Sequence, residues 1–319
     1  MSSARILLRT LTLAGVVLGL VVPAAAASAQ PSVSELTQQI NEESAELAKV
    51  VESYNRLREE AKATRAAAEK INSQLGPLEA ELARAETEVG QIAITAYKSG
   101  GLSTASALLD GTSGSFVDRL GTLDHLARDR QQRLTSFTDT QLTYLAEQEK
   151  LQAALKKQDA QVKELADRKK QIEADIDELM AKREQAYGTA TETGSSYTGP
   201  VPSVSGAAGT AVEFAYGAIG KPYVWAADGP NGYDCSGLTL AAWRAAGKSL
   251  PHNAAMQWDV VAKIDRGSLQ PGDLVFYSNL NHVGLYVGSG KVIHAPTFGR
   301  AVELASVDMM TPYGYGRVR

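Results

Sequence analysis

Residues 233–237 read Tyr-Asp-Cys-Ser-Gly, and residues 282–286 read His-Val-Gly-Leu-Tyr. The first stretch places Cys235, the single cysteine of the chain, where a loop rich in glycine and polar residues meets a predicted helix. Free N–H groups and the helix dipole favour a thiolate at such a position, and the thiolate is the nucleophilic form of cysteine. The two stretches therefore predict a domain built around a reactive thiol.

A thiol nucleophile needs a base, and the chain holds four histidines, His125, His252, His282 and His294. His282 opens one predicted strand and His294 closes the next, so a tight turn between the strands would bring their imidazoles together. Such a pair fits a general base and the group that orients it. A zinc site formed by Cys235 and the two histidines is an alternative, although zinc ligands are usually closely spaced in sequence.

The residues around this centre predict an α+β domain over 207–319. Helical spacing covers 208–219, the segment from Cys235 to just before Gly247, and 254–261. Strands are predicted at 273–277, 282–287, 291–294, 301–304 and 315–318. Short turns between consecutive strands favour antiparallel pairing, and helices followed by strands are typical of an α+β fold.

Residues 30–187 are rich in Ala, Glu, Gln, Lys, Leu and Arg, the composition of long helices. A heptad pattern from Val33 to Ala96 has mostly apolar a and d positions and predicts a coiled coil. Pro77 is expected to kink or break the helix, although the heptad phase continues beyond it. Helix breakers within 99–121 predict a small helical cap before a second arm at 122–187. Two arms joined by a cap favour an antiparallel hairpin, and a long parallel dimer is the alternative.

The first 29 residues have the features of a cleaved export signal. Arg5 and Arg9 precede an apolar run at 11–22, and Ala27-Ser28-Ala29 offers a cleavage site. A membrane anchor is the alternative, but the run is shorter than the ~18 apolar residues that a spanning helix needs. We therefore expect a secreted, extracytoplasmic protein. In that oxidising setting a lone cysteine cannot form an internal disulfide, which favours a catalytic role for it.

Residues 188–206 are rich in Gly, Ser, Thr and Pro and predict a flexible linker. Its reach of roughly 25 Å would let the last domain fold back against the helices. The sequence therefore predicts that the helical region masks the catalytic domain, and a purely positioning role for the helices is the alternative. The net charge of −4 and the absence of a basic run argue against nucleic acid as a partner.

Six short motifs resemble those of the NlpC/p60 peptidases, papain-like enzymes that cut peptidoglycan stem peptides, and they occur in the family's order. They are Gly220-Lys221-Pro222-Tyr223-Val224-Trp225, Tyr233-Asp234-Cys235-Ser236-Gly237, Leu250-Pro251-His252, Gln270-Pro271-Gly272-Asp273-Leu274-Val275-Phe276, His282-Val283-Gly284-Leu285-Tyr286 and Ile293-His294-Ala295-Pro296. One departure is Ala226-Ala227, where the family usually has two glycines. This departure leaves the conformation of the 226–232 loop in question.

The resemblance implies Cys235 as the nucleophile, His282 as the general base and His294 as the orienting third residue. It also implies that the Tyr223 hydroxyl lies beside the nucleophile, where it would help to stabilise an oxyanion. By the same resemblance, Asp234 and Ser236 lie at the substrate cleft. No cofactor is expected.

With its helical N-terminal region, the chain is similar to the RipC-type endopeptidases of actinobacteria. The similarity implies a secreted cysteine peptidase that hydrolyses the D-glutamyl-meso-diaminopimelate bond of stem peptides during cell separation or wall remodelling. It also implies that the helices dock on the membrane complex FtsEX. An amidase or acyltransferase on the same fold and a non-catalytic cell-wall-binding adaptor are the alternatives.

Overall fold

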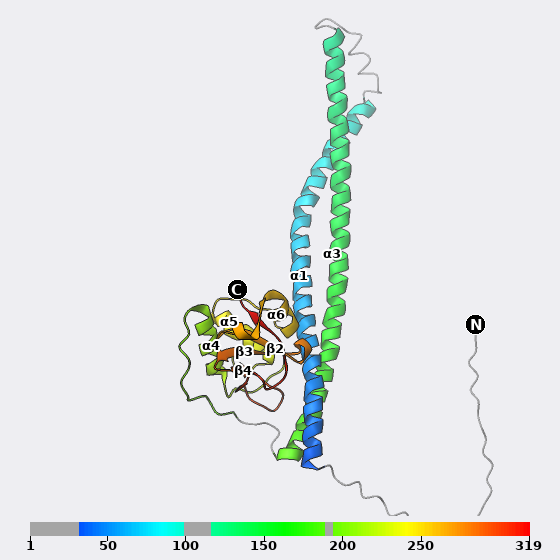
Figure 1. The fold of residues 1–319 in the computed structure, drawn as a ribbon. Helices are drawn as coiled ribbons and strands as arrows, with labels where there is room; N and C mark the ends of the chain where they lie inside the picture. The colour runs from blue at the N-terminus through cyan, green and yellow to red at the C-terminus, as the bar shows by residue number, and fades with distance from the viewer. Residues whose placement is uncertain (1–31, 99–115, 189–193) are drawn as a thin grey trace, which may run out of the picture.

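The computed structural model describes residues 32–98, 116–188 and 194–319. Two long helices form a hairpin, and the C-terminal residues form an α+β domain that lies beside the base of this hairpin (Figure 1). The predicted signal peptide lies outside the described residues, as does most of the predicted cap at 99–121. In the part of the chain that is described, no helix is both long enough and apolar enough to cross a membrane.

The hairpin consists of α1 (Val33–Lys98) and α3 (Phe116–Tyr187), which run antiparallel within one chain (Figure 1). Buried apolar side chains at heptad positions of α1 pack against buried side chains of α3. Polar contacts between the helices establish the antiparallel direction, because residues later in α1 contact residues earlier in α3. These contacts are Thr37 with Tyr187 at 3.0 Å, Ser53 with Arg168 at 2.6 Å and Glu88 with Arg133 at 2.9 Å.

Pro77 does not break α1, which continues as one helix from Val33 to Lys98. Proline removes one backbone hydrogen bond and crowds the preceding turn, at a cost of roughly 3 kcal/mol in a helix interior. The helical segments on both sides of Pro77 belong to the same hairpin, so their packing on α3 opposes this local cost. The expectation of a break in the helix was therefore wrong, whereas the continuous heptad phase anticipated the observed path.

The C-terminal domain has the predicted α+β fold, with helices packed on an antiparallel sheet. The sheet order is β1-β6-β2-β3-β4-β5, and every neighbouring pair is antiparallel. Helices α4 and α5 pack against β3. The helices are α4 (Gly206–Ala218), α5 (Cys235–Ala245) and α6 (Ala254–Val260), with short 3-10 helices at Arg266–Ser268 and Ser278–Leu280. The strands are β1 (Ala262–Ile264), β2 (Leu274–Tyr277), β3 (His282–Gly288), β4 (Lys291–His294), β5 (Glu303–Ser306) and β6 (Pro312–Arg317).

The core of this domain lies between the central strands and α5. Leu274, Phe276 and Leu285 of the sheet and Leu238 of α5 are each fully buried. Burial of such side chains stabilises a domain by ~2 kcal/mol each. This core holds the start of α5 against β3, which is where the predicted nucleophile and base reside.

Three strand predictions need correction. Strand β5 begins at Glu303 and not at Ala301, because Ala301 instead forms an isolated bridge with Pro222. Strand β6 begins at Pro312, in a Pro-Tyr-Gly sequence that resembles a turn but starts a strand, a position that proline tolerates. The three-residue strand β1 was not predicted, and it pairs with β6 at the edge of the sheet.

Part of the predicted linker packs on the C-terminal domain. Residues 194–205 form no helix or strand. A Cβ on Gly194 would lie 2.5 Å from Ala301 Cβ, so the chain passes close to the domain surface there. The rings of Tyr197 and Tyr216 lie 4.8 Å apart. The linker therefore lies along α4 before the domain begins, which shortens the reach that its length alone would allow.

The loop before α5 contains the Ala226-Ala227 departure. Ala226 has a φ of 53°, in the left-handed region that favours glycine, whereas Ala227 lies outside that region. The carbonyl of Ala226 accepts a hydrogen bond from Arg58 Nη1 at 2.9 Å, so the turn is also held from α1. The loop thus keeps a glycine-type conformation with an alanine in it.

We predict that Ala226→Gly raises the free energy of unfolding by ~0.5–1 kcal/mol. The left-handed conformation costs an L-residue ~1–2 kcal/mol, and glycine avoids this cost. About half of the gain is lost because glycine makes the unfolded chain more flexible. Ala227→Gly is the matched control and should lower the free energy of unfolding by ~0.4–1 kcal/mol. Urea unfolding followed by tryptophan fluorescence reports this domain alone, since all three tryptophans lie in it. Equal effects at the two positions would contradict strain at Ala226.

Candidate active site

Cys235 is the first residue of α5, and its neighbour Asp234 caps that helix. The Asp234 Oδ1 atom accepts the backbone N–H of Gly237 at 2.7 Å, which fixes the helix start. The thiol is free and only 3% exposed. Cys235 is therefore held where the sequence predicts, at a capped helix N-terminus inside the domain.

The electrostatic surroundings of the thiol differ from the sequence expectation. Burial, followed by the negative charges of Glu52 and Asp234, raises the pKa of Cys235 well above its usual value. The backbone N–H groups of Val283 and Ser236 act in the opposite direction. In this arrangement the carboxylates outweigh the helix N-terminus, so the thiol is protonated. The prediction of an easily ionised cysteine does not hold while Glu52 lies beside it.

His282 opens β3 and His294 closes β4, so the antiparallel pairing of these strands brings the two rings together. The His282 Nε2 and His294 Nδ1 atoms are 2.9 Å apart, and the rings are perpendicular. Burial and then the neighbouring His294 lower the pKa of His282 well below its usual value. His282 is therefore neutral, as a base that must accept a proton has to be.

Tyr223 is buried at 8% exposure, in the same core cluster as Cys235. Burial, and then the charges of Cys235 and Asp234, raise the pKa of Tyr223 well above its usual value. Its hydroxyl therefore stays protonated and can donate a hydrogen bond. This is the property that stabilisation of an oxyanion requires.

Asp234 also binds His252, whose Nε2 lies 2.9 Å and 3.0 Å from the two carboxylate oxygens. Burial acts to lower the pKa of His252, but the charge and hydrogen bond of Asp234 raise it overall. Asp234 thus favours the protonated form of His252 beside a buried carboxylate. Sequence reasoning treated it only as one of four candidate bases, and its partnership with Asp234 was missed.

The side chain of Glu52, from α1, reaches into the pocket beside the thiol and is only 3% exposed. Its Oε1 accepts hydrogen bonds from Ser236 Oγ at 2.6 Å and from Cys235 Sγ at 3.6 Å. Its Oε2 accepts from Asn253 Nδ2 at 2.8 Å and from the backbone N–H of Ala254 at 2.6 Å. The C-terminal domain therefore contains a cradle of donors that holds a carboxylate against its cysteine.

Further residues of α1 extend this docking along the helix. Asn55 Nδ2 donates to Asp234 Oδ2 at 2.9 Å. One turn on, Arg58 holds the Ala226 carbonyl. The ring of Tyr54 meets that of Trp225 edge to face, with centroids 5.2 Å apart. Helix α1 thus covers the thiol side of the site with a series of specific contacts.

Sequence reasoning missed Glu52 and Asn55 for a physical reason. In the heptad that starts at Val33 they occupy outward f and b positions, where polar side chains are ordinary in any coiled coil. Only Val51 gave a sequence signal of a further contact surface on α1, because it is an apolar residue at an e position. In the structure its side chain is 1% exposed.

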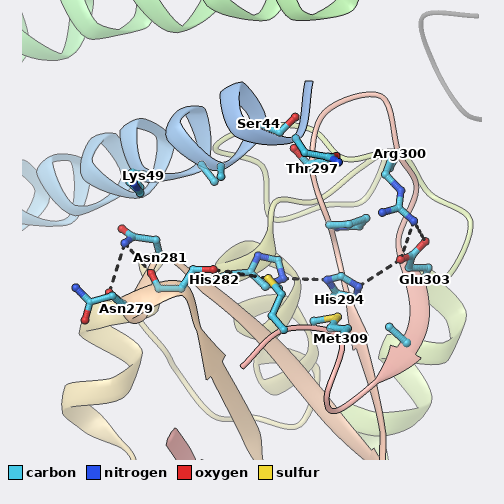
Figure 2. Close-up of a pocket in the computed structure, with 17 residues that line it drawn as sticks. Ser44, Lys49, Asn279, Asn281, His282, His294, Thr297, Arg300, Glu303 and Met309 are labelled. Atoms are coloured by element: carbon cyan, nitrogen blue, oxygen red, sulfur yellow. Dashed lines mark hydrogen bonds and ion pairs between the residues drawn. The ribbon is translucent and has the colours of Figure 1, made fainter. Parts of the chain in front are cut away.

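A cavity of about 860 Å³ opens beside the histidine pair, between α1 and the sheet (Figure 2). Helix α1 contributes Ser44 and Lys49 to its wall, and the C-terminal domain contributes both histidines and Arg300. The site is therefore blocked on the thiol side and open on the histidine side. No group of three or more His, Cys, Asp or Glu side chains among the described residues is placed to hold a metal ion.

A thiol at a helix N-terminus, packed against an antiparallel sheet that carries a histidine pair, is the arrangement of a cysteine-peptidase type of domain. Residues 220–316 match the model of the NlpC/P60 family. The C-terminal domain is therefore an NlpC/P60-type domain.

The curated relatives point the same way. A probable endopeptidase of Corynebacterium glutamicum is 39% identical over 126 residues, which cover 39% of this chain and 59% of the relative. A probable endopeptidase of Mycobacterium tuberculosis is 38% identical over 102 residues, which cover 32% of this chain and 26% of the relative. The matched stretches thus span less than two thirds of the length of either relative.

Among solved structures, the NlpC/p60 domain of the peptidoglycan hydrolase SagA is 32% identical, with 35% of this chain and 98% of that chain covered and a TM-score of 0.33. RipD from Mycobacterium tuberculosis, described as a non-catalytic NlpC/p60 domain protein adapted to peptidoglycan binding, is 26% identical over 36% of this chain and all of that chain, with a TM-score of 0.33.

Glu52 makes the docking of α1 sensitive to pH. Burial, followed by the charge of Asp234, raises the pKa of Glu52 from 4.5 to about 7. The docked state binds the Glu52 proton more tightly than the undocked state does. Docking of α1 is therefore strongest below about pH 4.5 and weakens as the pH rises toward 7 and above. The other titratable groups that face Glu52 are Cys235, Asp234 and His252.

We predict that alkylation of Cys235 by iodoacetamide shows this dependence. The ratio of the rate in the unmodified chain to that in Glu52→Gln should rise by about one to two orders of magnitude from pH 5 to pH 8, because only Glu52 acquires a charge. Ionisation of the thiol cancels in the ratio, and no other cysteine can react. A ratio that stays constant across this range would contradict the titration of Glu52 in the docked state.

Proposed function

We propose that this chain is an exported peptidoglycan endopeptidase that hydrolyses the D-glutamyl-meso-diaminopimelate bond of stem peptides with a cysteine nucleophile. The observation that carries the proposal is the buried Cys235 beside the hydrogen-bonded pair His282 and His294 in a domain of the NlpC/P60 family. Export rests on the N-terminal sequence, and a role in cell separation rests on the resemblance of the whole chain.

In the proposed reaction, His282 takes the thiol proton as Cys235 attacks the amide carbonyl. His282 then returns the proton to the leaving amine, and water releases the acyl group from the sulfur. The protonated hydroxyl of Tyr223 is available to bind the oxyanion that forms in between. His294 holds the ring of His282 through the 2.9 Å contact and so limits it to one productive orientation.

The carboxylate cradle supports the choice of bond. D-Glutamate in the stem peptide is linked through its side-chain carboxyl group, so its α-carboxylate stays free near the scissile amide. The donors of Ser236, Asn253 and the Ala254 backbone would bind that α-carboxylate as they now bind Glu52. The cavity beside the histidines would take the leaving, diaminopimelate side of the substrate.

Substrate and Glu52 would compete for the same donors, so α1 must leave before a stem peptide can bind. We therefore infer that the described arrangement is a masked state. A partner that binds the helical hairpin, such as the FtsEX complex implied by resemblance, would release it by stabilising the undocked hairpin.

Substitution of the catalytic residues tests the reaction directly. Cys235→Ala should abolish hydrolysis of defined muropeptides with little change in stability, and His282→Ala should lower kcat by ~10²–10⁴ because it removes the base. His294→Ala should have a smaller effect, since this residue orients the base and transfers no proton.

Mass spectrometry should detect a new free amine on diaminopimelate. Cleavage at another bond would indicate an amidase or another peptidase, and acyl transfer to an added amine would indicate an acyltransferase. Binding of the muropeptide without any product, in a protein freed from masking, would indicate an adaptor.

Substitutions on α1 test the masking. In the full chain, Asn55→Ala with Arg58→Ala should raise hydrolysis by about a hundredfold or more. Each loses a hydrogen bond that forms only in the docked state, and bonds to a charged group contribute ~1.5–3 kcal/mol. Arg56→Ala is the matched control, because Arg56 lies on the same turn, is exposed and pairs with Glu60 of the same helix at 3.3 Å. If the two proteins hydrolyse soluble muropeptides at the same rate, the helices position an always-active enzyme.

A further inference from the structure

Glu303 of β5 lies directly beyond the histidine pair (Figure 2). It pairs with His294 in the β4–β5 register, and its Oε1 is 3.4 Å from His294 Nε2. Arg300 Nη2 in turn donates to both carboxylate oxygens, at 3.0 Å and 2.7 Å. His282, His294, Glu303 and Arg300 thus form a chain of contacts from the buried histidine pair toward the surface of the domain.

The contact between the two histidines requires one proton and one lone pair. For His282 to act as a base toward Cys235 through Nδ1, its own proton must sit on Nε2, which then donates to His294 Nδ1. His294 must therefore carry its proton on Nε2. A neutral imidazole has one N–H, so the opposite tautomer of His294 would set its Nδ1–H against the Nε2–H of His282.

Glu303 is placed to select the required tautomer. His294 Nε2 is buried and makes no hydrogen bond of normal geometry with any residue in the described part of the chain, so the Glu303 carboxylate at 3.4 Å is the polar group placed to receive its proton. An ionised carboxylate only accepts hydrogen bonds, so a carboxylate beside Nε2 favours a proton on that nitrogen. Arg300 holds the carboxylate in place. The interaction with His294, and then the charge of Arg300, lower the pKa of Glu303.

We propose that Glu303 is a positioning residue that fixes His294 in its Nε2–H tautomer, so that His282 presents an unprotonated Nδ1 to Cys235. The catalytic part of this inference rests on the proposed function, whereas the tautomer itself does not. Glu303 acts through His294 and does not touch the thiol.

Long-range proton–nitrogen NMR spectra of the full chain labelled with 15N-histidine measure the tautomer without substrate. We expect His294 to be almost entirely in the Nε2–H form in the unmodified protein. In Glu303→Gln the side-chain amide offers a donor as well as an acceptor, so both tautomers of His294 should be populated. Unchanged His252 signals would verify the fold in each variant. A His294 with its proton on Nδ1, or the same tautomer in both proteins, would overturn the proposal.

Kinetics separate positioning from substrate binding. Combined with Asn55→Ala and Arg58→Ala to expose the site, Glu303→Gln should lower kcat by about tenfold or more with little change in KM. Glu303→Asp should restore part of kcat. Asp308→Asn is the matched control, because it removes a carboxylate that pairs with Arg266 at 2.7 Å through both oxygens but does not contact either histidine.

A rise in KM with unchanged kcat would instead make Glu303 a substrate contact and would overturn the positioning role. If the unmodified protein cleaves no stem peptide while His294 still responds to Glu303→Gln, the proposed function fails and the control of the tautomer stands.

Discussion

The buried carboxylate of Asp234 is the interaction on which the site and its cover both depend. It caps α5 through the Gly237 N–H, holds His252, and accepts Asn55 from α1. An unpaired carboxylate in this position would be costly, because burial removes it from water and nothing else would compensate its charge. The same group therefore fixes Cys235 at the start of α5 and stabilises the docked position of α1. Geometry for catalysis and geometry for docking cannot be changed independently at this point.

Local features of the sequence anticipated the domain well. The turn before Cys235, the strand-edge histidines and the alternation in β2, β3 and β4 depend on near neighbours, and these elements lie where they were predicted or within a residue. Errors arose where distant segments intervene. Ala301 bridges to Pro222 in place of joining β5, and Glu52 enters a pocket in a domain that lies far along the chain. A polar residue at an outward heptad position has no local signature that separates a solvent-exposed side chain from one inserted in another domain.

The docked helix changes the chemistry of the pocket as well as its access. Burial lowers the pKa of His282, while burial and nearby carboxylates raise that of Cys235, so both groups are neutral. These pKa shifts favour the neutral thiol and imidazole over the thiolate and imidazolium forms. Departure of α1 removes the Glu52 charge and admits water, and both changes favour ionisation of the thiol. The masking proposed above would thus be electrostatic in addition to steric.

The seclusion of the single cysteine also bears on how long the protein survives in an oxidising environment. An exposed thiolate is converted stepwise to sulfenic, sulfinic and sulfonic acids, and the later steps are irreversible for most proteins. This chain has no second cysteine that could trap the first oxidation product as a disulfide. A protonated thiol that is 3% exposed and hydrogen-bonded to Glu52 reacts slowly with peroxides, because oxidation follows thiolate character and access. The docked helix therefore protects a thiol whose oxidation no second cysteine of the chain could reverse. Under the proposed masking, the period of chemical vulnerability would begin only when α1 leaves the site.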